Sequence, residues 1–259
     1  MSNSSLVSYT KLSPHKSSRN GHAIDTISIH CVVGQCGVEA LGNVFQTKEA
    51  SANYGIGYDG RIGLYVDEAN RSWCTSSKAN DERAITIECA SDTSAPYAVN
   101  DKVYNALIDL LADVCKRNNI YPLKWSTSKD DRVNHKNGCN MTVHRDYANK
   151  SCPGDYLYSR HQAIADAVNK RIEDDMMVRY NSISEMPSWA KAEAQELIDI
   201  GALKGKGDNL DISEDMLRCM IICLRMSKAL IATIPDASID KDALFEEFKK
   251  NLKLTVEVE

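Results

Sequence analysis

Alternating polar and apolar positions predict β-strands in the first half of the chain. Residues 26–30 and residues 84–89 both alternate in this way, which is typical of strands that bury one face. Residues 53–65 hold two such segments joined by Asp59-Gly60, a turn that favours a hairpin because glycine accepts a positive φ. These segments predict that the first half of the chain contains a β-sheet.

Apolar residues spaced three and four positions apart predict helices between and after these strands. We expect a short helix at residues 40–45 and a long one at residues 103–118, with Asp101 as its N-cap. A further helix is expected at residues 156–177, whereas residues 121–140 are mixed in character and predict loops. Strands that alternate with helices in this order are typical of the α/β fold class.

The character of the sequence changes in the polar connection at residues 179–187. Beyond it the pattern predicts only helices, which fall at residues 188–200, 216–230 (capped by Ser213) and 240–253. We therefore predict an α/β domain at residues 1–178 and a small all-α domain at residues 179–259. The helix face that carries Met220 and Leu224 is expected to be left over for self-association into a homo-oligomer.

Composition and charge exclude several classes of protein. With 43% hydrophobic residues, 26% charged residues and a formal charge of −5, the chain has a globular composition and lacks the positive charge of a nucleic-acid-binding protein. Its longest apolar stretch, residues 216–234, is interrupted by Arg218, Arg225 and Lys228, so we expect no membrane span. The N-terminal segment lacks the apolar core of a secretory signal, which predicts synthesis in the cytoplasm with mostly reduced cysteines.

Three residues carry the candidate chemistry: His30, His144 and Cys152. In the strand at residues 26–30, Ser28 and His30 share the face opposite the isoleucines, so the imidazole leaves the core-facing side. His144 and Cys152 lie eight residues apart, a spacing at which a loop can bring both side chains to one point. A single histidine is more often structural, but two imidazoles and a thiolate form a set that zinc favours. Three protein ligands leave a fourth position for water, which is typical of a catalytic site.

Several motifs follow one another along the chain: His30, Asn53-Tyr54-Gly55-Ile56, Asp59-Gly60-Arg61-Ile62, Ile85-Thr86-Ile87-Glu88, His144 and Lys150-Ser151-Cys152-Pro153-Gly154. This series resembles the type 2 N-acetylmuramoyl-L-alanine amidases, which share a fold with the peptidoglycan recognition proteins. It is most similar to phage or prophage endolysins of Gram-positive bacteria, and it covers roughly residues 10–172. The resemblance implies a central mixed β-sheet flanked by helices, with a zinc cleft whose ligands are His30, His144 and Cys152.

The resemblance also implies hydrolysis of the amide between the lactyl group of N-acetylmuramic acid and the L-alanine of peptidoglycan. It implies Glu88 as the general base, Lys150 as the cation that stabilises the oxyanion, and Tyr54 as a third catalytic residue. Trp73 lies where the cleft wall of the family runs, so it is a candidate for stacking on the substrate. Each has an alternative: Glu88 as a solvated strand residue, Lys150 as a surface lysine, Tyr54 as hairpin packing and Trp73 as core packing.

Two other functions fit the same resemblance. One is a peptidoglycan-binding protein that does not cut, but its relatives usually lack the cysteine ligand that Cys152 supplies here. The other is a bacterial wall-recycling amidase, because the expected lack of a signal peptide fits this enzyme as well as an endolysin released through a holin. Residues 186–218 weakly resemble half of an S-layer-homology-like unit, which implies wall binding, with dimerisation as the alternative. The histidines that match no ligand position of the family are His15, His22, His135 and His161.

Overall fold

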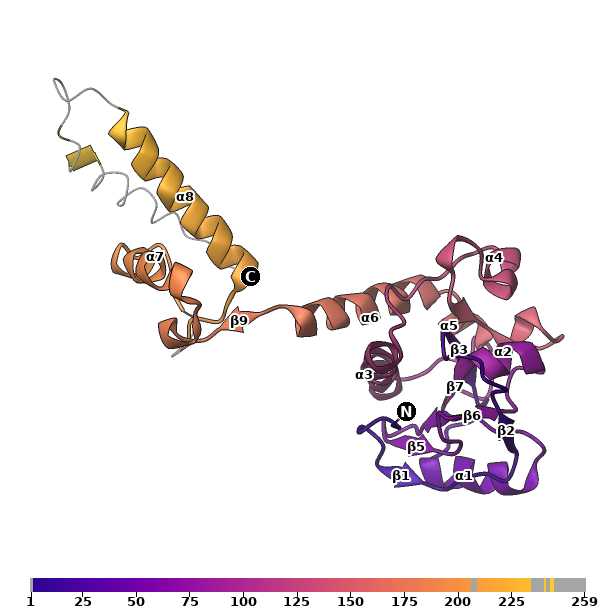
Figure 1. Cartoon of the computed structure of the whole chain (residues 1–259). Coiled ribbons are helices and arrows are strands. Elements are labelled where there is room, and N and C mark those ends of the chain that lie inside the picture. Colours follow the sequence, from indigo (N-terminus) through magenta and orange to yellow (C-terminus); the bar gives the residue numbers. More distant parts are fainter. Residues whose placement is uncertain (1, 206–208, 234–239, 241–242, 245–259) are drawn as a thin grey trace. The chain divides into compact units, whose positions relative to one another are not determined.

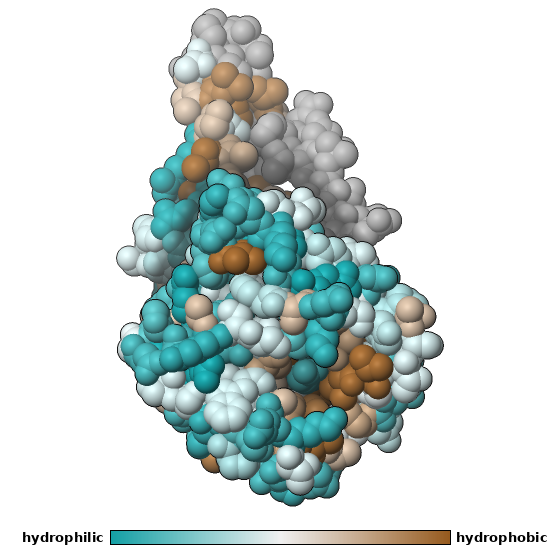
Figure 2. All heavy atoms as spheres, turned by 90° about the vertical axis from the view of Figure 1, so that its right-hand side faces the viewer, coloured by the Kyte–Doolittle hydropathy of each residue, from teal (hydrophilic) through white to brown (hydrophobic). Residues whose placement is uncertain are grey.

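The computed structural model describes residues 2–205, 209–233, 240 and 243–244. The chain divides into two compact units, Met1–Asp175 and Met176–Glu259 (Figure 1). Within the described residues, no helix has the length and apolar character needed to cross a membrane. In Figure 2 the visible surface of the first unit is largely hydrophilic, with scattered hydrophobic residues, as is usual for a surface that faces water.

A six-stranded mixed sheet forms the centre of the first unit. Strands β4 and β5 pair antiparallel, as the predicted hairpin requires, and the other neighbouring strands pair parallel. The predicted strands at residues 26–30 and 84–89 are β3 and β7, which lie side by side. The α/β class and the central mixed sheet are therefore confirmed. In sheet order the strands are β1 (Tyr9–Thr10), β5 (Ile62–Leu64), β4 (Tyr54–Ile56), β7 (Ala84–Cys89), β3 (Thr26–Cys31) and β8 (Met141–Thr142).

Helices connect these strands, and two short strands pair antiparallel outside the main sheet. The predicted helix at residues 156–177 is divided into α5 and α6. Nδ1 of His161 lies 2.8 Å from the carbonyl of Leu157, the group that an uninterrupted helix would pair with the N–H of His161. The predicted loops at residues 121–140 contain α4. The elements are β2 (Lys16–Ser18), α1 (Val38–Thr47), β6 (Asn70–Ser72), α2 (Lys78–Arg83), α3 (Asp101–Asn118), α4 (Lys129–Asn134), η1 (Lys136–Gly138), η2 (His144–Asp146), α5 (Gly154–Tyr158) and α6 (His161–Met176).

Helix α3 is capped by Asn100 rather than by Asp101, the residue that the sequence favoured. The side chain of Asn100 accepts a hydrogen bond from the backbone N–H of Val103 at 3.0 Å. Asn100 has the extended backbone that a cap requires, whereas Asp101 is already the first helical residue. Asp101 instead places its negative charge in the first turn, where it interacts favourably with the helix dipole.

The central strands are buried on both faces, not on one face as their alternation predicted. All six residues of β3 are buried, and in β7 only Glu88 is half-buried. The isoleucines face a core that α3 and α6 complete. On the opposite face Thr86 is hydrogen-bonded to Ser72 of β6 at 2.7 Å, and Thr142 to Asn80 of α2 at 2.8 Å. Protein rather than water therefore covers the polar face. The hydroxyl groups tolerate this burial because β6 and α2 supply hydrogen-bond partners for them.

The second unit contains two of the predicted helices and one strand pair that the sequence did not predict. Ser213 caps α8, because its side chain accepts a hydrogen bond from the N–H of Met216 at 3.2 Å. Strands β9 and β10 pair antiparallel, so the unit is not purely helical. The predicted helix at residues 240–253 lies outside the described residues except for residues 240 and 243–244. The elements are β9 (Arg179–Tyr180), η3 (Ile183–Glu185), α7 (Ser188–Asp199), β10 (Ile212–Ser213) and α8 (Glu214–Ala232).

The face of α8 that was expected to be left over belongs instead to the core of the second unit. Leu224 is buried, and Met220 packs against the same core. Helix α8 uses this face to contact α7, which leaves a different set of apolar side chains at the surface. The exposed large apolar residues of α8 are Met216, Ile222, Met226 and Leu230.

Candidate metal centre

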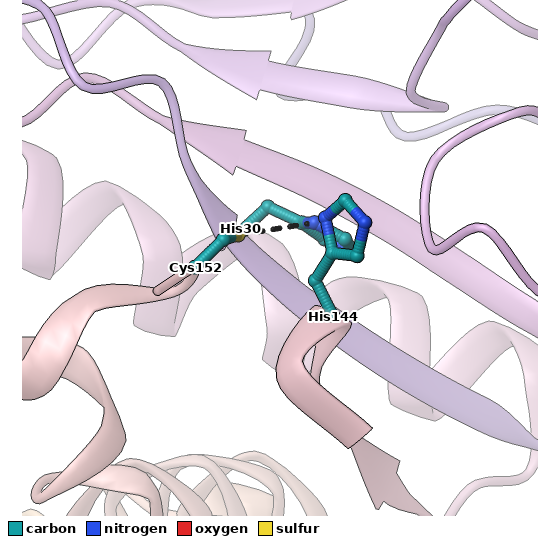
Figure 3. A group of neighbouring side chains, drawn as sticks. All are labelled: His30, His144 and Cys152. Carbon is teal, nitrogen blue, oxygen red and sulfur yellow. Dashed lines mark hydrogen bonds between the residues drawn. The ribbon is translucent and has the colours of Figure 1, made fainter. Parts of the chain in front are cut away.

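His30 and His144 meet because they lie at the ends of parallel strands. Strands β3 and β8 are parallel neighbours, so their carboxyl ends lie at the same edge of the sheet. His30 is close to the end of β3, and His144 begins η2 two residues after β8. The chain then turns back, and the N–H of Arg145 donates to the carbonyl of Cys152 at 3.2 Å. The structure therefore brings His30, His144 and Cys152 together (Figure 3).

These three side chains are close enough to share one metal ion. The Sγ atom of Cys152 lies 3.3 Å from Nδ1 of His30, and the centroids of the two imidazole rings are 5.2 Å apart. One ligand atom from each residue lies within 4.8 Å of the other two. His30 is fully buried, whereas His144 and Cys152 are half-buried. The cluster is thus accessible from the side of His144 and Cys152.

The two imidazoles have the protonation state that suits a cation, whereas the thiol must first lose its proton. Burial, followed by the charge of His144, lowers the pKa of His30 to about 3. Burial and the charge of Lys150 also lower the pKa of His144. Both imidazoles are therefore neutral at pH 7, which is the form that binds metal. A hydrogen bond with Cys31, together with burial, raises the pKa of Cys152 well above its usual value, so a metal ion must displace the thiol proton.

A buried ion pair holds the segment that carries His144. The guanidinium of Arg132 makes two contacts of 2.7 Å with the carboxylate of Asp146, and both side chains are buried. The Cζ atom of Arg132 also lies 4.6 Å from the centroid of the Trp125 ring. Because Arg132 is in α4, this pair fixes α4 to η2, two residues from His144. The sequence did not predict this contact, since its partners lie 14 positions apart in a region without periodicity.

Glu88 lies beside His30 on the neighbouring strand β7. Its Oε1 is 3.9 Å from Sγ of Cys74, and its Oε2 is buried without a hydrogen-bond partner in the described part of the chain. Burial raises the pKa of Glu88 to about 8, and the charge of Cys31 adds to this effect. The carboxyl group of Glu88 is therefore buried next to the group formed by His30, His144 and Cys152, which argues against the alternative of a solvated strand residue.

Lys150 and Trp73 differ in their relation to the cluster. Lys150 is exposed, and its charge lowers the pKa of His144, so its ammonium lies near the cluster. Trp73 is half-buried, and its indole N–H donates to Ser17 at 3.2 Å while its ring centroid lies 5.6 Å from that of His15. These contacts connect Trp73 to Ser17 of β2 and to His15, which precedes β2. They favour a packing role for Trp73.

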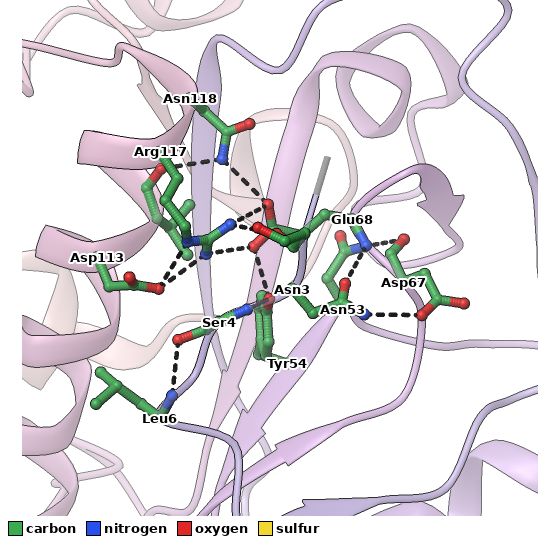
Figure 4. Close-up of polar contacts among 12 residues, drawn as sticks. Asn3, Ser4, Leu6, Asn53, Tyr54, Asp67, Glu68, Asp113, Arg117 and Asn118 are labelled. Carbon is green, nitrogen blue, oxygen red and sulfur yellow. Dashed lines mark hydrogen bonds and ion pairs between the residues drawn. The ribbon is translucent and has the colours of Figure 1, made fainter.

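Tyr54 belongs to a buried polar network centred on Glu68 (Figure 4). Its side chain is fully buried, and its hydroxyl donates to Glu68 at 2.6 Å and accepts from the N–H of Ser4 at 2.9 Å. Glu68 also pairs with Arg117 at 2.7 Å and accepts from Asn118 at 3.1 Å. Burial, followed by the charge of Glu68, raises the pKa of Tyr54. Because its hydroxyl is occupied inside the protein, Tyr54 fits the packing alternative better than a catalytic role.

The remaining histidines do not join a metal-ligand set within the described residues. His161 is fully buried and packs against Trp125, with the two rings tilted by 38° and their centroids 4.3 Å apart. His22 is exposed, whereas His15 and His135 are half-buried. These positions are those of structural and surface residues.

The chain is similar to known proteins, and the family match lies within its first unit. The family model of N-acetylmuramoyl-L-alanine amidase matches residues 15–155, which is more than half of the chain. A selenomethionine derivative of AmpD is 21% identical, with a TM-score of 0.46, and the match covers 62% of this chain and 95% of that chain. The N-acetylmuramoyl-L-alanine amidase LysC from Clostridium intestinale URNW is 17% identical, with a TM-score of 0.43, and the match covers 62% and 95% of the two chains.

A mutant endolysin from Bacillus subtilis is 14% identical, with a TM-score of 0.45, and the match covers 62% of this chain and 97% of that chain. No curated protein matches the chain. The residues that the family model matches include His30, Glu88, His144, Lys150 and Cys152.

Proposed function

The chain belongs to the N-acetylmuramoyl-L-alanine amidase family, whose substrate is peptidoglycan. We propose that this protein hydrolyses the amide bond between N-acetylmuramic acid and L-alanine with a zinc ion held by His30, His144 and Cys152. The observation that carries this proposal is the convergence of two neutral imidazoles and one thiol at one point. Such a donor set suits Zn²⁺ and leaves one coordination position free. A zinc ion bound there would act as a Lewis acid on the scissile carbonyl and would activate a water molecule.

Two further side chains are proposed to carry out the proton transfer and the charge stabilisation. Glu88 lies next to His30, and its buried carboxylate is suited to take a proton from the attacking water and pass it to the leaving amine of L-alanine. Lys150 is exposed near His144, and its ammonium is suited to stabilise the negative charge that develops on the carbonyl oxygen.

Digestion of purified peptidoglycan tests which bond is cut. We expect the release of free amines without new reducing ends, and mass analysis should find stem peptides that begin with L-alanine. New reducing ends without free amines would show a glycosidase and would contradict the proposal. Binding to the wall with neither product would favour the peptidoglycan-binding protein that does not cut.

Replacing Lys150 by alanine should lower kcat by on the order of 10²-fold, because its charge is needed chiefly in the transition state. Zinc content should stay unchanged, since Lys150 is not one of the proposed ligands. The matched control is Lys170→Ala, which removes an exposed lysine of α6 that pairs with Asp174. If kcat were the same in both variants, Lys150 would be an ordinary surface lysine.

We also propose that the enzyme is an endolysin and that residues 179–259 form a wall-targeting module. The second unit is compact with a core of its own, and none of its described residues belongs to a metal-ligand set. A bacterial wall-recycling amidase is the second candidate. A neighbouring holin gene would favour the endolysin, and a cluster of wall-recycling genes would favour the alternative.

A fluorescent protein fused to residues 180–259 should decorate Gram-positive cells if this module directs the enzyme to the wall. Residues 1–178 alone should then cut soluble peptidoglycan fragments as fast as the full chain but lyse whole cells several-fold more slowly. The fluorescent protein without the module is the control. If the fusion did not bind and residues 1–178 kept full lytic activity, only a structural or oligomerisation role would remain.

A further inference from the structure

A second group of metal-binding side chains lies next to the first. One ligand atom each from His30, Cys74 and Glu88 lies within 4.8 Å of the other two. The two groups share His30. No other group of possible metal ligands occurs in the described part of the chain. The second group therefore lies on the β7 side of His30, where Glu88 is its partner across the ladder.

Cys74 is held in place by its backbone. It lies between β6 and α2, and its N–H donates to the carboxylate of Asp81 at 3.0 Å. The hydroxyl of Thr75 donates to the same carboxylate at 2.5 Å, and Asp81 is buried in α2. This anchored turn presents Sγ of Cys74 at 3.9 Å from Oε1 of Glu88. The thiol and the carboxylate are thus brought together by fixed backbone segments.

One oxygen atom of the Glu88 carboxylate lacks a hydrogen-bond donor in the described residues. Its Oε2 is buried and has no hydrogen-bond partner in the described residues, which is an unfavourable state for a carboxylate oxygen. A cation bound between Glu88 and Cys74 would satisfy this atom. Nitrogen, thiolate and carboxylate donors together suit Zn²⁺ better than they suit Mg²⁺ or Ca²⁺. An imidazole has two ring nitrogens, so His30 can bind one ion through each of them once it loses its ring proton, and Nε2 must then also leave its 3.1 Å contact with the hydroxyl of Ser28.

We propose that His30, Cys74 and Glu88 form a second, inhibitory site for Zn²⁺. The inhibition rests on the proposed function, in which Glu88 is the general base, because a carboxylate that binds a cation cannot take a proton from water. Cys74 distinguishes this site from the first, since it has no part in the proposed amide hydrolysis. The second site fills when zinc exceeds the amount that the His30, His144 and Cys152 group binds.

Binding of Co²⁺ tests the site without any measurement of activity. The full chain carries Cys152→Ser, which disables the first group, and Cys219→Ser with Cys223→Ser, which removes two exposed thiols. We expect the near-ultraviolet charge-transfer band of a Co²⁺–thiolate bond, and we expect Cys74→Ser to abolish it. The control is Cys36→Ser, because this half-buried cysteine lies outside both groups and its loss should leave the band.

The absence of this band, or a band that survives Cys74→Ser, would overturn the proposed site. Circular dichroism of each variant checks that the fold is intact.

Activity at different zinc concentrations tests the inhibition in the protein that keeps all its cysteines. Its amidase rate in a large molar excess of zinc should fall several-fold below the rate at one equivalent. In Cys74→Ser the ratio of the two rates should return close to unity. An equal fall in both proteins would overturn the inhibitory role. A lack of amidase activity at every zinc concentration would instead contradict the proposed function and would leave the Co²⁺ result standing.

Discussion

Replacing Glu88 by glutamine is expected to lower the turnover of the amidase by on the order of 10²-fold or more, as for the loss of a general base. Glutamine keeps the size and shape of the side chain but is a far weaker base. At no more than one equivalent of zinc, the zinc content and the fold should stay unchanged, because Glu88 is not in the group formed by His30, His144 and Cys152. Free-amine release measures kcat, and metal analysis measures the zinc. An unchanged turnover would give Glu88 a structural role only.

The pH dependence of the rate provides a second test of Glu88. In the metal-free protein burial raises its pKa to about 8, so the carboxyl group is largely protonated at pH 7. A base must be ionised to act, so the rate should rise with pH as Glu88 loses its proton. A bound cation favours the carboxylate and moves this rise to lower pH. Glu88→Gln should lose the rising limb, and a limb that persists would belong to another group.

Replacing Cys152 by serine is expected to remove most of the zinc and to reduce activity to the level of the metal-free protein. A neutral hydroxyl is a poor substitute for a thiolate in a zinc site. Metal analysis after dialysis measures the loss in a Cys74→Ser background, which removes the proposed inhibitory site, and compares Cys74→Ser with the doubly substituted Cys74→Ser, Cys152→Ser protein. Cys36→Ser is the matched control, because this cysteine lies outside both groups. Full zinc content in the Cys74→Ser, Cys152→Ser protein would show that the ligand assignment is wrong.

The sequence predicted the elements whose signals are local. The alternation in residues 84–89 and the Asp59-Gly60 turn correspond to β7 and the β4–β5 hairpin. The strands β1, β2 and β6 were missed, since two or three residues are too few for a periodic pattern. Helices α2 and α4 were missed for the same reason, because each has only six residues. Burial of both faces of β3 was also missed, since it depends on what packs on the sheet.

The candidate site shows the same limit. His30, His144 and Cys152 could be grouped from residue type and order, and the structure brings them together. The surroundings of Tyr54 could not be predicted from the sequence. Its hydroxyl partner Glu68 lies 14 positions away, and Glu68 is paired in turn with Arg117, 49 positions further on. The approach of Cys74 to Glu88 likewise depends on how β6 and α2 pack beside β7, which no pattern within either segment encodes.

The ion pair between Arg132 and Asp146 limits which substitutions this amidase can accept at these two positions during evolution. Removing one member of a buried pair costs about 3–5 kcal/mol, because the other charge stays buried and unpaired. This is a large share of the roughly 5–15 kcal/mol by which a typical protein is stable. The damage would also reach the segment that carries His144. Substitutions at the two positions are therefore expected to occur together, so that position 132 should co-vary with the loop that carries His144 and Cys152.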